Sequence, residues 1–315
     1  MRITTAFAIP AAFGVAAALA LTGCDLENLG PGDRFKSDFH YSYDVNSGAR
    51  IDIESFNGSV EIEGWDQNKV DVEGTKYGAT EQLRDAIRIN ISPSPSAISI
   101  RAEHPSDLHG SMGARFRVRA PRDAEIGRAV TSNGPLRVSQ LAGNPHLKTS
   151  NGSIRVQNLK GGVDAQTSNG PIDVADIRED AVLHTSNGRI SGDDIGGNVE
   201  AQTSNSGINV RLDHSPSAPI KLETSNGPVD LAMRERPHAD VRARTNNGGI
   251  SLHLPEDTSA RIDASTSNSS ISSDFDVFTH GQISKNRLDG SIGNGGPILT
   301  LSTSNGPIHI VKGGR

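Results

Sequence analysis

The chain has 315 residues, of which 34% are hydrophobic, 4% are aromatic and 22% are charged. Its formal net charge is −6, from 31 basic and 37 acidic residues, so it lacks the basic excess expected of a nucleic-acid-binding protein. The chain has a single cysteine, so it cannot form an intramolecular disulfide.

The first 23 residues have the features of an export signal. Arg2 precedes an apolar run from Ala6 to Leu21, which is short for a membrane-spanning helix and typical of a removed signal peptide. The run ends in Leu21-Thr22-Gly23-Cys24, which resembles the lipobox of bacterial lipoprotein precursors. The resemblance implies that Cys24 becomes the lipidated, palmitate-bearing first residue of an exported protein anchored to the cell envelope. An ordinary signal with an incidental cysteine is the alternative, and the choice of membrane or leaflet stays open.

Two segments separate Cys24 from the repeats that follow. Residues 24–38 are interpreted as a lipidated tether, because they contain Gly30, Pro31 and Gly32 and little apolar surface. Residues 39–129 show strand-like alternation and are interpreted as an N-terminal cap with the first coils, which would protect an open sheet edge.

One helix and one cluster of aromatic residues are expected within the cap. The helix is predicted from Thr80 to Arg88, with Leu83 and Ile87 on one face. We interpret the aromatic residues as the core of the cap. The alternative is an aromatic ligand platform, with Trp65 as its best candidate.

The signature Thr-Ser-Asn-Gly repeats through residues 130–315, which we interpret as the β-helix repeat region. It begins at Thr131, Thr149, Thr167 and Thr185, and variants begin at Thr203, Thr224, Thr245, Thr266 and Thr303. The first five copies are 18 residues apart and the next three follow at intervals of 21, whereas the last gap of 37 leaves room for one unmarked copy. A fixed period of this length predicts a solenoid.

Within a repeat, apolar residues recur at steps of two on both sides of a break. Ile154 and Val156 form one such pair, and Val163 and Ala165 form the next. Steps of two predict strands, and Asn151-Gly152 is a turn signal, so each unit is predicted to form two or three short strands. Stacked units would share one aliphatic interior. The sequence therefore predicts an all-β fold, a single-stranded parallel β-helix that the crossover rule makes right-handed.

The asparagines of the signature fall at one corner of every predicted coil. There an amide tolerates left-handed geometry and bonds to the amide of the next coil, as in the Asn ladders of stacked strands. The predicted structural ladder contains Asn133, Asn151, Asn169, Asn187, Asn205, Asn226, Asn247, Asn268 and Asn305. A polar row that binds sugar or metal is the alternative, but hydroxyl neighbours are poor cation ligands. No metal or cofactor is expected.

Acidic residues of neighbouring coils raise an enzymatic alternative. Asp173, Asp176, Asp193 and Asp194 could approach one another, and β-helical polysaccharide lyases and hydrolases use carboxylate clusters on their shafts. The loops here are short, however, and the sequence contains no metalloprotease, serine-hydrolase or phosphate-loop motif. We therefore expect no catalytic residue and no enzyme.

The Thr-Ser-Asn-Gly-Pro-Ile pattern resembles a family of bacterial adhesin candidates built from β-strand repeats, related to the auto-transporter adhesin head (GIN) domain. The resemblance extends from about Ile51 to Ile310, with departures at Ser206, Asn246 and Ser269. It implies an exported or surface-anchored β-helix with a role in adhesion and offers no catalytic residue. We therefore expect an envelope lipoprotein held to the membrane by Cys24, with an envelope polysaccharide or a protein as partner and no nucleic acid.

Overall fold

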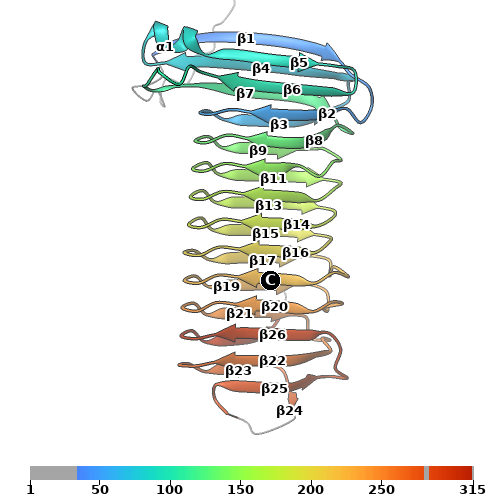
Figure 1. Cartoon of the computed structure of the whole chain (residues 1–315). Helices are drawn as coiled ribbons and strands as arrows, with labels where there is room; N and C mark the ends of the chain where they lie inside the picture. The colour runs from blue at the N-terminus through green and yellow to red at the C-terminus, as the bar shows by residue number, and fades with distance from the viewer. Residues whose placement is uncertain (1–33, 280–283, 314–315) are drawn as a thin grey trace, which may run out of the picture.

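The computed structural model describes residues 34–279 and 284–313, which form a tall stack of coils (Figure 1). Two long sheets, one of 13 and one of 14 strands, run along the stack, and successive coils pair in parallel. Each regular coil contributes one strand to each sheet. The predicted all-β solenoid is thus confirmed, with two strands in each regular coil.

The first sheet, sheet A, contains thirteen strands. In spatial order they are β1 (Phe35–Asp44), β4 (Lys69–Gly78), β7 (Met112–Pro121), β3 (Val60–Trp65), β9 (Leu136–Ser139), β11 (Ile154–Leu159), β13 (Ile172–Ile177), β15 (Ile190–Ile195), β17 (Ile208–Leu212), β19 (Val229–Met233), β21 (Ile250–Leu254), β27 (Ile308–Lys312) and β23 (Ile271–Ser273).

The second sheet, sheet B, contains fourteen strands. In spatial order they are β24 (Val277–Thr279), β25 (Arg287–Ile292), β22 (Ala260–Thr266), β26 (Ile298–Thr303), β20 (Val241–Arg244), β18 (Ile220–Glu223), β16 (Val199–Gln202), β14 (Ala181–His184), β12 (Val163–Gln166), β10 (His146–Lys148), β8 (Glu125–Val130), β2 (Arg50–Glu54), β6 (Ala97–Glu103) and β5 (Arg88–Pro93).

The core lies between the two sheets and follows the 18-residue period. Ile154 pairs with Ile172, and Val156 pairs with Val174, so equivalent side chains stack directly upon one another. These four residues are at most 3% exposed, while their strand neighbours point to solvent. The alternation that predicted the strands therefore separates the aliphatic interior from the polar surface.

A left-handed residue explains why the inward positions of sheet A change from a step of two to a step of three. Val156 and Leu159 both face the core, and Asn158 between them has a φ of 56°. Such a residue reverses the alternation, so that the following side chain points inward. The non-glycine residues with positive φ in the described chain all occupy this position: Gln140, Asn158, Asp176 and Asp194. The expectation of left-handed geometry at the ladder asparagines is therefore wrong.

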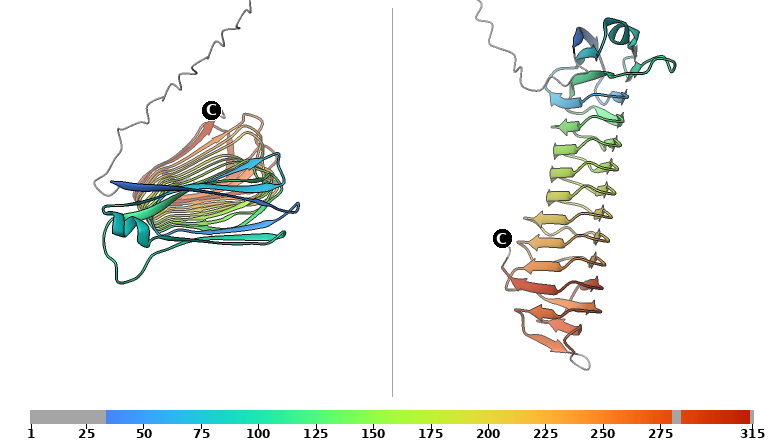
Figure 2. Two further views of the ribbon diagram at one scale, coloured as in Figure 1. Left: turned by 90° about the horizontal axis from the view of Figure 1, so that it is seen from above. Right: turned by 90° about the vertical axis from the view of Figure 1, so that its left-hand side faces the viewer.

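The last 37-residue gap holds no unmarked coil of the stack. The final coil, β26 and β27, is instead inserted between the coil of β20 and β21 and the coil of β22 and β23 (Figures 1 and 2). The intervening chain forms β24 and β25, and β25 pairs antiparallel with β22. This hairpin forms the end of sheet B. At this end of the stack, the spatial order of the coils therefore differs from their order in the chain.

The other end of the stack carries the antiparallel strands β1, β4 and β7 in sheet A and the antiparallel pair β5 and β6 in sheet B. The single helix of the described residues, α1 (Glu81–Ala86), begins after Thr80, whose hydroxyl accepts a hydrogen bond from the Leu83 amide. The helix is shorter than predicted, because Ile87 is extended and β5 begins at Arg88.

The predicted signal peptide, Cys24 and most of the tether lie outside the described residues. The predicted end of the tether at Asp38 is wrong, because Phe35–Asp38 form the start of β1 and pair with β4. Within residues 34–279 and 284–313, none of the helical structure has the length and apolar character that a membrane crossing requires.

Candidate functional site

The asparagine column forms a continuous row of side-chain hydrogen bonds along one corner of the stack. Each amide nitrogen donates to the amide oxygen of the preceding asparagine at 2.5–2.9 Å. In spatial order the row contains Asn57, Asn133, Asn151, Asn169, Asn187, Asn205, Asn226, Asn247, Asn305 and Asn268. Asn57 was missed as a ladder member, although Asn57-Gly58-Ser59 carries the same local sequence as Asn151-Gly152-Ser153.

The threonine that opens each signature forms a second, buried row. Thr149 is 2% exposed, and its hydroxyl donates to the Gly134 carbonyl oxygen and accepts from the Gly152 amide, both at 3.1 Å. Thr167 and Thr185 repeat these two bonds in the following coils. The inward position of these threonines could be predicted from the spacing, but their hydroxyl bonds could not. The hydroxyl satisfies backbone groups that the corner would otherwise bury without partners.

We expect Asn169→Ala to cost more stability than Ser168→Ala. Asn169 takes part in two ladder bonds, each 2.7 Å long, whereas the exposed Ser168 hydroxyl has no hydrogen bond in the described structure. Loss of the amide should cost about 1 kcal/mol, and loss of the hydroxyl should be close to neutral. Chemical denaturation of both variants measures the difference. Equal costs would contradict a stabilising role for the ladder.

The four candidate catalytic carboxylates do not gather into one cluster. Asp173 is opposite Ser191 and lies 3.5 Å from Arg155 and 3.3 Å from Arg189. Asp193 is instead opposite Ala175 and Arg211.

Asp176 and Asp194 occupy equivalent left-handed positions one coil apart, at a strand spacing of about 4.8 Å. A hollow of about 360 Å³ beside this column is lined by Asp176 together with the cations of Arg122, Lys160 and Arg178. The hollow therefore surrounds one acid with basic side chains, which is unlike the paired carboxylates of glycoside hydrolysis.

Trp65, the candidate for an aromatic platform, makes contacts within the cap. Its indole nitrogen donates to the Lys69 carbonyl oxygen at 2.9 Å, and the Arg119 guanidinium lies 4.8 Å from the ring centroid. Phe39 and Phe116 pack edge to face at 5.5 Å against the core. One face of Trp65 is thus covered by a cation, and the two phenylalanines contribute to packing.

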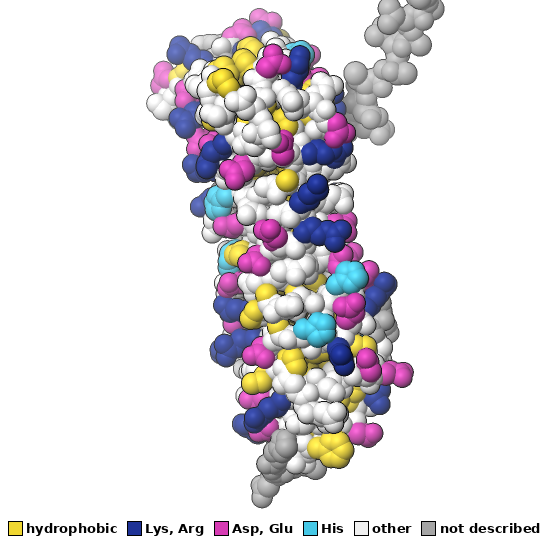
Figure 3. All heavy atoms as spheres, turned by 90° about the vertical axis from the view of Figure 1, so that its right-hand side faces the viewer, with side chains coloured by type: hydrophobic (Ala, Val, Ile, Leu, Met, Phe, Trp, Pro, Cys, Tyr) yellow, Lys and Arg dark blue, Asp and Glu magenta, His cyan; other side chains and the backbone are white. Residues whose placement is uncertain are grey.

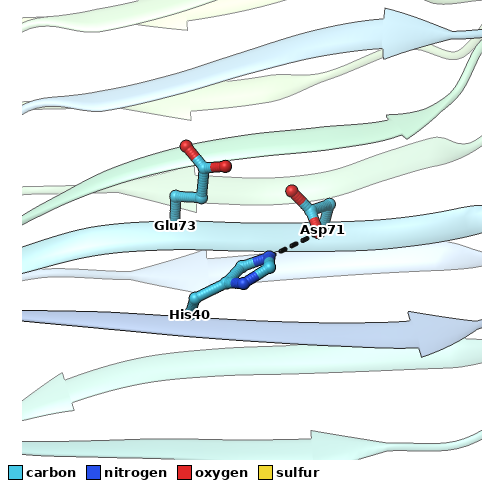
Figure 4. Close-up of side chains that lie close together, drawn as sticks. All are labelled: His40, Asp71 and Glu73. Atoms are coloured by element: carbon cyan, nitrogen blue, oxygen red, sulfur yellow. Dashed lines mark hydrogen bonds and ion pairs between the residues drawn. The ribbon is translucent and has the colours of Figure 1, made fainter. Parts of the chain in front are cut away.

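A charged cluster that sequence reasoning missed lies on the outer face of the cap (Figure 4). His40 on β1 bonds through Nε2 to Asp71 on β4 at 2.7 Å. Arg119 on β7 donates to Asp71 at 2.9 Å and to Glu73 at 3.1 Å. Forty-eight residues separate Asp71 from Arg119, so only the pairing of β4 with β7 brings them together.

The cluster also has a donor set that suits a metal ion, because ligand atoms of His40, Asp71 and Glu73 lie within 4.8 Å of one another. Arg119 already bonds to both carboxylates, however, and supplies the positive charge that they would otherwise lack. Asp71 is 8% exposed in its side chain and is fully engaged by His40 and Arg119. The arrangement is therefore an ion-pair network rather than a prepared metal site.

Burial alone would raise the pKa of Asp71, but hydrogen bonds from His40 and Arg119 outweigh it and hold the pKa below its ordinary value. A carboxyl with a lowered pKa stabilises the fold above its unfolded pKa and loses that contribution as the pH falls through its folded pKa. We therefore expect Asp71→Asn to be less stable than the wild type at neutral pH. The difference should shrink below about pH 4, near the unfolded pKa of an aspartate. Denaturation at a series of pH values checks this, and a difference that is independent of pH would contradict it.

A hollow with a volume of about 630 Å³ adjoins this cluster. Its charged lining comes from four strands and includes Asp38, His40, Glu61, Glu73, Arg115 and Arg117. Acids and bases alternate from strand to strand, because Glu73 pairs with Arg117 and Arg117 pairs with Glu61. The hollow is thus polar and of mixed charge.

The mixed pattern continues along the shaft (Figure 3). In sheet A the outward column runs from Glu61 through Arg137 and Arg155 to Asp173 and Ser191, each opposite the next. In sheet B, Glu200 is opposite Lys221, and the two side chains form an ion pair of 2.9 Å. Neither column presents a field of one sign, and both offer flat rows of hydrogen-bonding and charged groups.

Comparison with known proteins places the repeat region in a described family. The family model called Toastrack DUF4097 matches residues 124–311, about three fifths of the chain. None of the curated proteins compared with the chain matches it significantly.

Solved structures similar to the chain include a proposed cell adhesion protein from Clostridium sporogenes, at 10% identity and a TM-score of 0.28, covering 89% of this chain and 100% of that one. A proposed adhesin from Parabacteroides merdae has 11% identity and a TM-score of 0.39, covering 87% of this chain and 96% of that one. A proposed adhesin from Bacteroides fragilis has 12% identity and a TM-score of 0.25, covering 87% and 97%.

Proposed function

The chain belongs to the Toastrack DUF4097 family, and we propose that it is a non-enzymatic lipoprotein of the bacterial cell envelope. In this proposal the outer faces of the solenoid bind a partner, either an envelope polysaccharide or a protein, and so mediate adhesion or envelope interaction. The observation that carries the proposal is the pair of long, in-register outer columns on sheets A and B, which display exposed and half-buried, mostly polar groups at a constant spacing around a buried aliphatic core.

Rigidity supports the use of the shaft as a binding surface. Every coil shares the aliphatic interior with its neighbours, and the threonine and asparagine rows bond adjacent corners. Side chains on such a surface lose little further freedom when a partner binds, which lowers the entropic cost of association. The flat faces suit an extended partner better than a small molecule, since small ligands favour concave sites.

A capture experiment tests the proposal and identifies the face. The full chain, immobilised from detergent, is incubated with envelope polysaccharides and with a membrane-protein extract. We expect one component to be retained and its binding to weaken when the charge of one face is reversed. Arg137→Glu with Arg155→Glu alters sheet A, and Arg242→Glu with Arg244→Glu makes the same change of charge on sheet B. Retention of nothing by the folded wild type would oppose the proposal.

The proposed anchor makes a separate prediction. Cys24→Ser should release the protein from membranes into the soluble fraction, because it removes the only thiol that can be lipidated. Fractionation of cells that express the wild type and the variant measures this. If the variant still needs detergent for extraction, the lipid anchor is not what holds the protein.

A further inference from the structure

Strand β1 ends sheet A at the N-terminal end of the stack and presents a long edge (Figure 1). It has ten residues, and all ten pair with β4 on one side. Its other side makes no backbone hydrogen bond within the described residues. An edge of this length is a template for adding another strand unless charges or a covering segment block it.

The charges on β1 complement a second copy of the same strand. Lys36 is exposed and forms no ion pair in the described structure. Asp44 near the opposite end lies 3.7 Å from Lys69 of β4 but is still 87% exposed in its side chain, so it can accept a second cation. Both residues lie on the outer face with His40, because all three have even positions in the strand. In an antiparallel pair centred on His40, each Lys36 stands opposite the other copy's Asp44.

The same register also brings aromatic side chains on the inner faces of the two β1 strands opposite each other. Tyr41 is 39% exposed, one of three large hydrophobic residues so exposed within the described part of the chain, and it would stand opposite Phe39 of the second copy. Directly opposed aromatic side chains stabilise antiparallel strands. A register centred on Phe39 would instead place Tyr41 opposite Ser37 and Lys36 opposite Ser42. The His40-centred register is thus the one that pairs both the free cation and the exposed ring.

We propose that two copies of the chain associate through β1, in a two-fold symmetric, antiparallel pairing centred on His40. Sheet A would then run unbroken from one copy into the other, and the two solenoids would meet cap to cap. The contact is isologous, so it closes at two copies and does not propagate into a fibre. Its backbone hydrogen bonds provide affinity, while the Lys36–Asp44 and Phe39–Tyr41 pairs fix the register.

A charge-swap series tests the interface on the full chain in detergent, with mass measured by light scattering and by sedimentation. The wild type should have the mass of a dimer at tens of micromolar. Lys36→Asp should raise the dissociation constant about tenfold or more, since two like-charge pairs replace two ion pairs. The double variant Lys36→Asp, Asp44→Lys should restore the dimer. A monomeric wild type, or a double variant that stays monomeric while folded, would overturn the proposal.

Disulfide trapping tests the register independently. In the full chain with Cys24→Ser, His40→Cys introduces the only thiol at the symmetry axis. We expect it to form a covalent dimer under mild oxidation. Ser42→Cys is the matched control on the same exposed strand, and it should remain monomeric because it faces Asp38 of the second copy. Cross-linking at both positions or at Ser42 alone would contradict the His40-centred pairing.

Discussion

Replacement of Val156 by aspartate should unfold the coils around it. Val156 is fully buried and stacks between Val138 and Val174 of the adjoining coils. The substitution removes aliphatic contacts and places an unpaired charge among them, so we expect a loss of more than about 4 kcal/mol. Each coil is stabilised by its contacts with the two adjacent coils, so unfolding of this coil should destabilise its neighbours and proceed along the stack from this point.

Circular dichroism during thermal and chemical denaturation measures that loss. The matched control is Gln157→Asp, which introduces the same charge at the next position of β11, where the side chain is exposed. The control should melt like the wild type. If Val156→Asp is soluble and melts at the same temperature as the wild type, the inward assignment of this column is wrong.

The second large effect is expected at the corner glycines. A Cβ atom added to Gly170 would lie 1.8 Å from the Gly152 carbonyl oxygen, and the neighbouring coils repeat this approach. Backbone atoms cannot move aside without separating the coils and breaking the threonine and asparagine rows. Gly170→Ala should therefore destabilise the protein by about 3 kcal/mol or more.

Gly192→Ala is a control for which we expect a gain in stability instead of a loss. Gly192 occupies the inward position that Val174 and Val210 fill in the adjoining coils. An added Cβ would meet the flexible end of Ile195 at 3.0 Å and otherwise pack at ordinary distances. We expect a gain of about 0.5–1 kcal/mol, because alanine restricts the unfolded chain. Denaturant titration of both variants checks the pair, and equal losses would show that the corner is not specially crowded.

The strands of the shaft and their inward positions could largely be predicted, because the same pattern of apolar residues recurs in many repeats. Residues such as Ile154, Val156, Val163 and Ala165 recur every 18 positions, and alternation has one structural meaning in a strand. The step from Val156 to Leu159 was visible as well. Its cause, the left-handed backbone at Asn158, was not, because nothing in the local sequence separates that residue from the corner asparagines.

The position of the final coil could not be predicted, because the coils are interchangeable. Thr303, Asn305 and Ile308 present the same groups as their counterparts in any other repeat, so they fit next to any coil. The chain order suggests the end of the stack, whereas the structure places this coil one step inside it. Only the closing hairpin of β24 and β25 distinguishes the two arrangements.

The cap cluster was missed for a different reason. His40, Asp71 and Arg119 come from three strands, and no short motif joins them. Their proximity depends on the register of the antiparallel strands in the cap. The repeats do not include these strands and therefore do not predict that register. The asparagine column, in contrast, could be listed from the signature, apart from Asn57, which follows Ser55-Phe56 instead of Thr-Ser.

The measurement that tests the proposed function most directly is the length of an envelope polysaccharide after incubation with the full chain. Retention on the protein and glycan length are followed in the same samples. We predict that the glycan, if it is the partner, is retained with its length unchanged, and that a protein partner leaves it unbound and intact. Shortening of the glycan that Asp176→Asn or Asp194→Asn abolishes would contradict a non-enzymatic role and assign catalysis to this stacked pair of carboxylates.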